Sequence, residues 1–200
     1  MKTCLIKNGL VRWISWMLAM LMLPSLADAH IVAGQTSGFV HGLVHPFTGF
    51  DHIAAMVAVG LWAAQRGGRA LWVVPLTFVG VMSVSGLLGM TGASIPFVEP
   101  GIAASVLVLG LLVAAAVRLP LVASSLIVGL FAVFHGYAHG TEMPETMSGL
   151  GYGVGFMLAT GLLHCCGIGL GLLAGRLQSP RVVRYAGGAT AALGVYLLVS

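Results

Sequence analysis

Histidine and acidic side chains gather in two short segments of an otherwise apolar chain. The first segment carries three imidazoles and a carboxylate, and the second carries two imidazoles and a carboxylate: His41, His45, Asp51 and His52, then His135, His139 and Glu142. Neutral imidazole with carboxylate oxygen is a ligand set for borderline divalent cations such as Ni²⁺, Co²⁺ and Zn²⁺. The three cysteines form no spaced set of thiolates, which argues against a copper or iron–sulfur site. We therefore interpret the two segments as ligands for a divalent cation.

Helical spacing would bring the ligands of each segment to one face. The histidines of the first segment stand at i, i+4 and i+11, an arc of about 40° at 100° per residue, and the second segment spans an arc of about 60°. Pro46 disfavours α geometry at the residue before it, and Gly49 permits local unwinding, so we expect the first helix to start or kink here. Irregular backbone at membrane depth is tolerated where it lines a cavity.

Composition places the chain in a membrane. Of the 200 residues, 58% are hydrophobic and only 7% are charged, far below the roughly 25% of an ordinary soluble domain. This excludes a soluble globule and a disordered chain, and the glycines lack the three-residue period of collagen. The sequence contains neither a phosphate-binding G-x-x-x-x-G-K-[ST] loop nor a G-x-S-x-G elbow. The cations are scattered singly, so no nucleic-acid partner is expected.

Residues 1–29 have the pattern of a secretory signal peptide. Three cations lead into an apolar run, 13–23, that is too short to cross a bilayer, and Ala27-Asp28-Ala29 is a small-residue cleavage site. We expect cleavage after Ala29, which would leave His30 as the first residue of the mature chain, outside the cytoplasm. An uncleaved first helix is the alternative, and the small-residue site favours cleavage.

Beyond the leader, six apolar windows approach the roughly 20 residues that a helix needs to cross a bilayer. They lie at about 41–65, 70–90, 98–117, 120–140, 150–174 and 182–199. With the N-terminus outside, every Lys and Arg after the leader falls on the inner side, as the positive-inside rule requires. The sequence therefore predicts an all-α bundle of six transmembrane helices over 30–200, multi-pass in a bacterial inner membrane, with both ends periplasmic. Both ligand segments then lie toward the outer leaflet.

The fifth window carries a pattern of small residues that predicts close helix packing. Gly151-x-x-x-Gly155 and Gly167-x-x-x-Gly171-x-x-x-Gly175 repeat at the spacing of one helix face. Glycine on a transmembrane helix lets a neighbouring backbone approach closely. We expect a tight bundle without a wide aqueous pore.

The remaining histidines and cysteines are weaker candidates. A hydrogen bond to a backbone carbonyl would explain His30, His41 or His164 as well as a metal ligand would. His164 lies near the middle of its helix, so it could also be a deeper ligand. The sequence does not decide whether the adjacent Cys165 and Cys166 contact metal.

Three motifs resemble those of a known family. The first, His45-Pro46-Phe47-Thr48-Gly49-Phe50-Asp51-His52, resembles the signature of the HupE/UreJ family; Phe134-His135-Gly136-Tyr137-Ala138-His139-Gly140 with Glu142, and Leu163-His164 with Gly167, are similar to two further family segments. The first motif also resembles the H-x-x-x-x-D-H helix of the nickel/cobalt permeases, with one more residue before Asp51. The resemblance covers essentially the whole mature chain. It implies secondary uptake of Ni²⁺, in some members Co²⁺, for hydrogenase or urease maturation.

We therefore interpret the protein as a transporter and not an enzyme. The cation is its transported substrate, and we expect no permanently bound cofactor. An inside-negative potential would contribute about 2.3 kcal/mol per charge per 100 mV, about 4.6 kcal/mol for a dication. A membrane-embedded zinc hydrolase using the same ligands and a metal-bound water is the alternative, and a bis-histidine haem protein is a third. The sequence leaves open the choice between nickel and cobalt, any coupling ion, homo-oligomerisation and an indirect link to maturation proteins. Its expected partners are the cation and the lipid bilayer.

Overall fold

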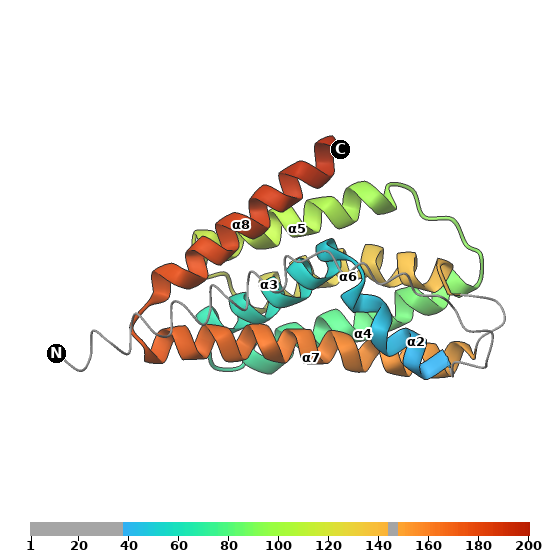
Figure 1. Ribbon diagram of the computed structural model, residues 1–200, viewed down its shortest axis with the longest axis horizontal. Coiled ribbons are helices and arrows are strands. Elements are labelled where there is room, and N and C mark those ends of the chain that lie inside the picture. Colours follow the sequence, from blue (N-terminus) through green and yellow to red (C-terminus); the bar gives the residue numbers. More distant parts are fainter. Residues whose placement is uncertain (1–37, 144–147) are drawn as a thin grey trace. The chain divides into compact units, whose positions relative to one another are not determined.

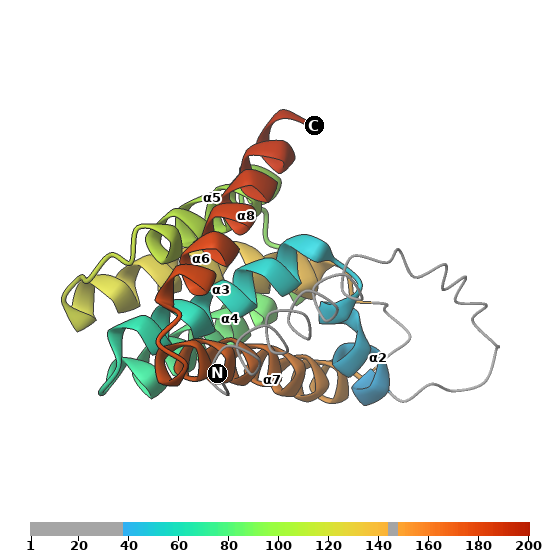
Figure 2. The ribbon, with the colours of Figure 1, turned by 60° about the vertical axis from the view of Figure 1, so that its left-hand side comes forward.

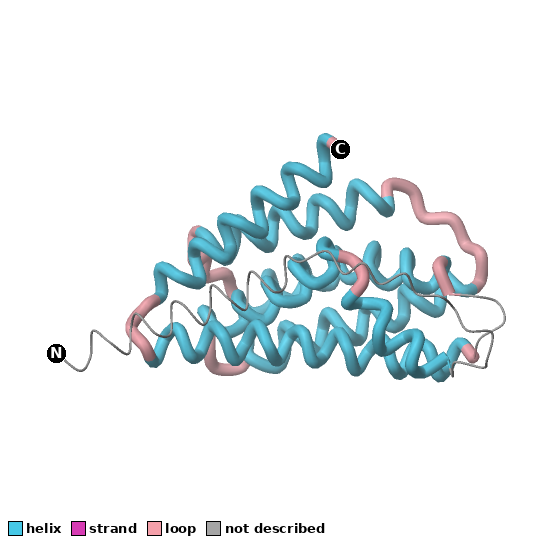
Figure 3. Tube along the Cα trace, in the orientation of Figure 1, coloured by secondary structure: helices cyan, strands magenta, loops and turns pink. Residues whose placement is uncertain are grey.

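The computed structural model describes residues 38–143 and 148–200, which all belong to one compact unit. Every regular element in these residues is helical, and none is a strand (Figure 3). The elements are α2 (Gly38–Val44), the 3₁₀ helix η1 (His45–Phe47), α3 (Phe50–Arg66), α4 (Ala70–Met90), α5 (Val98–Ala114), α6 (Leu121–Thr141), α7 (Gly149–Arg176) and α8 (Pro180–Val199). The predicted signal peptide and His30 lie outside the described residues.

The described helices are those of a multi-pass membrane protein. Four of them, α4, α6, α7 and α8, are long and apolar enough to cross a membrane, and α2–η1 with α3 passes the same test as one broken span. Helix α5 is apolar but has only 17 residues. The all-α prediction is confirmed, and four to five of the six windows qualify as spans by length and composition.

The first window is broken where the sequence predicts a kink. Its two parts meet at an angle of 80°. Pro46 lies in η1, a single 3₁₀ turn that tolerates its missing N–H, and Gly49 is extended at φ −106° and ψ 123° just before α3. Because the helix is not continuous, the predicted 40° arc does not describe how His45 and His52 approach each other. The bend determines their arrangement instead.

The arginines of the described residues all lie at one end of the bundle. Arg66 at the end of α3 donates to Ser124 Oγ near the start of α6 at 3.1 Å. Arg184 near the start of α8 donates to the carbonyl of Ala114, the last residue of α5, at 2.7 Å. These two bonds hold the α3–α4, α5–α6 and α7–α8 loops at the same end of the bundle. All six arginines lie in these loops or beside them: Arg66, Arg69, Arg118, Arg176, Arg181 and Arg184. In Figure 1 the α7–α8 loop at this end lies on the left, and α2 lies on the right.

Glycines bring neighbouring helices into close contact. A Cβ on Gly60 of α3 would meet the backbone of Gly167 on α7, and a Cβ on Gly167 would meet Gly60 in return. Similar contacts join α4 to α6 through Gly89 and Gly140, and α5 to α8 through Gly110 and Gly187. Figures 1 and 2 show α5 and α8 side by side, and the α5–α8 pair is one of the most extensive in the bundle.

The small-residue face that the sequence predicts on α7 is confirmed over most of its length. Gly155 faces the backbone of Phe39 on α2, and Gly171 faces Ala64 on α3. Gly175 lies in open space within the described residues. Helix α7 therefore packs along both halves of the broken first span and holds the bend in place.

Candidate metal site

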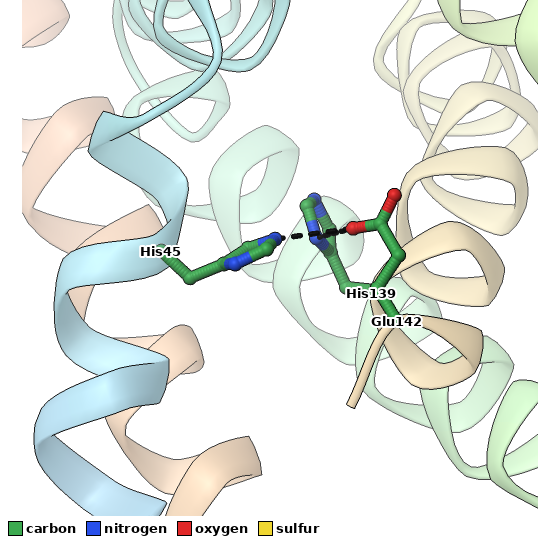
Figure 4. Close-up of side chains that lie close together, drawn as sticks. All are labelled: His45, His139 and Glu142. Atoms are coloured by element: carbon green, nitrogen blue, oxygen red, sulfur yellow. Dashed lines mark hydrogen bonds and ion pairs between the residues drawn. The ribbon is translucent and has the colours of Figure 1, made fainter. Parts of the chain in front are cut away.

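Three side chains meet near the end of the bundle opposite the arginines, and we call them the outer triad: His45, His139 and Glu142 (Figure 4). His45 Nε2 lies 3.1 Å from Glu142 Oε2. His139 Nδ1 lies 3.4 Å from the same oxygen, within ion-pair distance. One donor atom from each residue lies within 4.8 Å of the other two. First-row cations hold nitrogen and oxygen ligands at about 2.0–2.2 Å, so small side-chain movements would let one ion contact all three.

The local structure explains how the outer triad assembles. His45 begins the 3₁₀ turn at the bend, while His139 and Glu142 sit one turn apart at the end of α6. The side chain of Glu142 is 52% exposed, that of His45 is 22% exposed and that of His139 is 5% exposed. The outer triad is therefore open to solvent on its acidic side and closed on its inner side.

The charge of the outer triad suits a cation. Hydrogen bonding to the imidazoles of His139 and His45 holds the pKa of the Glu142 carboxyl well below its usual range, against the opposing effect of partial burial. Glu142 is consequently ionised at neutral pH. A carboxylate beside two imidazoles supplies one negative and two neutral donors, which a borderline divalent cation accepts.

Imidazoles continue from the outer triad into the protein. The ring centroid of His52 lies 4.1 Å from that of His139 and 4.7 Å from that of His135. All three rings are buried. Nε2 of His52, Nδ1 of His135 and Nε2 of His139 have no hydrogen-bond partner among the described residues. An unpaired buried polar group costs about 1–3 kcal/mol, so this concentration of them indicates a binding function.

Asp51 orients the first of the buried imidazoles. Its Oδ1 lies 3.1 Å from His52 Nδ1. A Cβ at position 49 would stand 2.6 Å from Asp51 Oδ1 and 3.1 Å from His52 Nδ1, so only Gly49 leaves room for this hydrogen bond. Sequence reasoning assigned Gly49 to local unwinding and missed this second requirement.

Replacing Gly49 by alanine should therefore impair the site without unfolding the protein. The added methyl group would push the Asp51 carboxylate away and release His52, and loss of such an orienting partner typically costs 10–100-fold in metal affinity or activity. Radiolabelled nickel uptake should fall by about 10-fold or more. Gly153→Ala is the matched control, because a Cβ there meets nothing within 4 Å. Equal uptake by the two variants would contradict this function of Gly49.

The weaker candidates occupy different places. His41 lies at the edge of the outer triad, with its ring 6.0 Å from that of His45. His164 is buried on α7, both of its ring nitrogens lack a partner among the described residues, and its ring lies 5.3 Å from Phe78. Cys165 and Cys166 are exposed. Neither cysteine belongs to the metal-ligand group found in the described residues.

Three residues at the site were missed by sequence reasoning. Phe78 of α4 lies between the rings of His135 and His164, at 5.7 and 5.3 Å. Ser105 of α5 lies 2.7 Å from His135 Nε2. The ring of Tyr152 on α7 lies 5.9 Å from that of His45. The only signal for Ser105 was a hydroxyl in a helix that is apolar beyond Glu99 in its first turn. The two aromatic residues resemble ordinary core residues in the sequence.

Comparison with known proteins agrees with these motifs. A family model described as HupE / UreJ protein matches residues 18–197. A curated relative, Protein HupE of Rhizobium leguminosarum bv. viciae, is 50% identical over 182 residues, which cover 91% of this chain and 95% of that protein. No solved structure matches the chain. The chain belongs to the HupE/UreJ family.

Proposed function

We propose that the protein imports a divalent cation, Ni²⁺ or Co²⁺, across the bacterial inner membrane for hydrogenase or urease maturation. The observation that carries the proposal is the outer triad and its continuation into buried imidazoles, whose nitrogens include several without a partner among the described residues. Membership of the HupE/UreJ family supports it. The cation is the transported substrate, and the protein needs no permanently bound cofactor.

The distribution of charge supports an orientation with the outer triad toward the periplasm. Cytoplasmic loops of membrane proteins carry an excess of arginine and lysine, and every arginine of the described residues lies at the opposite end. We extend the proposal to a cleaved signal peptide, 1–29, and a six-span transport domain, 30–200, with both ends periplasmic. An entering cation would then meet Glu142 first, because it is the most exposed member of the outer triad.

Transport in this proposal requires a second conformation. Toward the arginine end, the space below the imidazoles is filled by apolar side chains that are fully buried, among them Trp62, Val74, Leu109 and Val113. A bare dication cannot cross packed hydrocarbon, since an uncompensated charge in such surroundings is prohibitively costly. The described conformation therefore offers access from the triad end alone, as in the alternating access of secondary transporters.

Loss of the Glu142 carboxylate should lower uptake by a similar factor across the neutral pH range. Hydrogen bonding to the imidazoles of His139 and His45 holds the pKa of Glu142 well below its usual range, so the carboxylate stays ionised as pH drops from about 7.5 to about 5.5. Glu142→Gln should therefore reduce the initial rate of nickel uptake by the same factor at both pH values. A loss that disappears toward the lower pH would contradict an ionised carboxylate in the outer triad.

The proposal is tested by ion flux in proteoliposomes. Purified protein should accumulate radiolabelled nickel under an inside-negative potential, without ATP, and excess Co²⁺ should compete. The same assay with His45→Ala, Asp51→Ala, His52→Ala and His139→Ala should show reduced uptake in each case. Unchanged uptake in all four variants would refute the route. A tightly bound zinc and lipid turnover without flux would support the hydrolase alternative instead.

A further inference from the structure

We propose that a second cation site lies directly below the outer triad, formed by the imidazoles of His52, His135 and His139, and that Ser105 positions His135 within it. We call this the inner site. It deepens the proposed function, on which it rests, by specifying where the ion goes after the outer triad and which residue outside the predicted ligand set prepares that step.

The hydrogen bonds of Ser105 determine which nitrogen of His135 is free. The hydroxyl of Ser105 has one proton, which it donates to the carbonyl of Ile102 at 2.6 Å. Ser105 Oγ also lies 2.7 Å from His135 Nε2, so in this second bond it must accept. His135 therefore carries its proton on Nε2. In the neutral ring this leaves the lone pair of Nδ1 unprotonated, and Nδ1 is the buried nitrogen that lacks a partner among the described residues.

His52 is prepared in the same way by a different residue. A carboxylate can only accept, so Asp51 Oδ1 accepts a hydrogen bond from the N–H at Nδ1 of His52, at 3.1 Å. Nε2 of His52 then has no proton, and its lone pair is available to a cation. It too is buried without a partner among the described residues. An imidazole that ligates a metal usually gives its other N–H to a carboxylate, carbonyl or similar acceptor. His52 and His135 both have this arrangement, and their ring centroids are 4.7 Å apart.

His139 joins the two sites. Its ring centroid lies 4.8 Å from that of His45 in the outer triad and 4.1 Å from that of His52 in the inner site. Nδ1 faces Glu142 at 3.4 Å. A neutral imidazole has only one unprotonated nitrogen, so His139 can bind the ion in one site at a time. A turn of its ring can carry the cation from Glu142 and His45 toward His52 and His135. Since the two sites share this one ligand, they hold one ion at a time.

The inner site also defines the class of ion that passes. Its three ligands are neutral nitrogens, which suit borderline transition-metal ions and give no advantage to Mg²⁺ or Ca²⁺, which prefer oxygen. Among the described residues, the outer triad is the one group whose donor atoms already lie close enough together to hold an ion. The rings of the inner site must therefore turn when the ion arrives, which matches a transit site better than a closed structural one.

Cobalt binding tests the inner site without reference to transport. In the full-length protein in detergent, the double variant His45→Ala with Glu142→Gln removes two ligands of the outer triad. This variant should still bind about one Co²⁺, with a visible absorption spectrum of imidazole ligation. Adding His135→Gln, which retains a donor toward Ser105 but loses Nδ1, should abolish that binding.

Ser105→Ala in the same double variant should weaken Co²⁺ affinity by 10–100-fold, and Ser105→Thr, which restores a hydroxyl, should recover it. Ser85→Ala is the matched control, because the hydroxyl of Ser85 is also buried but donates to the carbonyl of Val133 and makes no hydrogen bond to an imidazole of the described residues. Its Co²⁺ affinity should equal that of the double variant. In an otherwise wild-type chain, Ser105→Ala should lower the maximal rate of nickel uptake by about 10-fold. The nickel concentration that gives half-maximal uptake should change less in Ser105→Ala than in Glu142→Gln.

The outcomes separate the inner site from the transport proposal. No Co²⁺ binding by the double variant, or undiminished binding after His135→Gln or Ser105→Ala, would overturn the inner site, even if the wild-type protein imports nickel. Absence of import by the wild-type protein would overturn the proposed function, and the cobalt measurements would still report on the inner site.

Discussion

Replacing His139 by alanine is expected to cause the largest loss of uptake of any single substitution. Its imidazole lies beside Glu142 in the outer triad and against His52 in the buried chain. Other ligands serve one site, whereas His139 is common to both. If loss of an orienting partner alone costs 10–100-fold, loss of the shared ligand should reduce initial nickel uptake by about 100-fold or more. The measurement is uptake of radiolabelled nickel by cells, normalised to the amount of the protein in the membrane.

His41→Ala is the matched control for this prediction. His41 lies near the same end of the bundle, but its ring is 6.0 Å from that of His45 and it belongs to neither site. It should lose far less uptake than His139→Ala at equal expression. If the two variants behave alike, or if His139→Ala retains most of the wild-type rate, the two sites do not share this ligand.

Replacing Gly167 by alanine is expected to lower the stability of the protein strongly. Gly167 and Gly60 allow the backbones of α7 and α3 to touch, and a Cβ at position 167 would stand only 3.0 Å from Gly60 Cα and from Leu61 N. Backbone cannot move aside as a flexible side chain can, so the two helices must separate. Overpacking of this kind typically costs 1–3 kcal/mol of folding free energy. The midpoint of thermal unfolding in detergent should fall clearly.

Gly169→Ala is the control on the same helix. Gly169 is exposed, and a Cβ there meets nothing within 4 Å. Alanine has a higher helix propensity than glycine by about 1 kcal/mol, so this variant should unfold at the wild-type midpoint or above it. Equal unfolding midpoints for the two variants would show that the contact between α3 and α7 does not require glycine at position 167.

The local features of the fold could be predicted from the sequence because they depend on neighbouring residues. Apolar windows of sufficient length predicted helices, and each is helical in the structure. Pro46 and Gly49 predicted the break in the first window, which is an 80° bend. The periodicity of α6 placed His139 and Glu142 on one side of that helix, and they share the outer triad.

The arrangement between helices could not be predicted in the same way. The arc calculated for a continuous first helix fails, because the bend turns His45 toward α6 independently of the face of α3. Ser105 and Phe78 contact His135 only after α4, α5 and α6 have packed together. The sequence of a mostly apolar helix does not indicate which serine or phenylalanine will contact a histidine of another helix. Lipid-facing and core positions have similar composition in a membrane protein.

The most direct test of the central claim, that the outer triad admits the transported cation, is nickel flux through a variant that lacks it. Proteoliposomes with the wild-type protein and with the triple variant His45→Ala, His139→Ala, Glu142→Gln should be compared under the same inside-negative potential. We predict accumulation of radiolabelled nickel by the wild-type protein and only the background of empty liposomes with the triple variant. Accumulation at the wild-type rate by the triple variant would contradict the account.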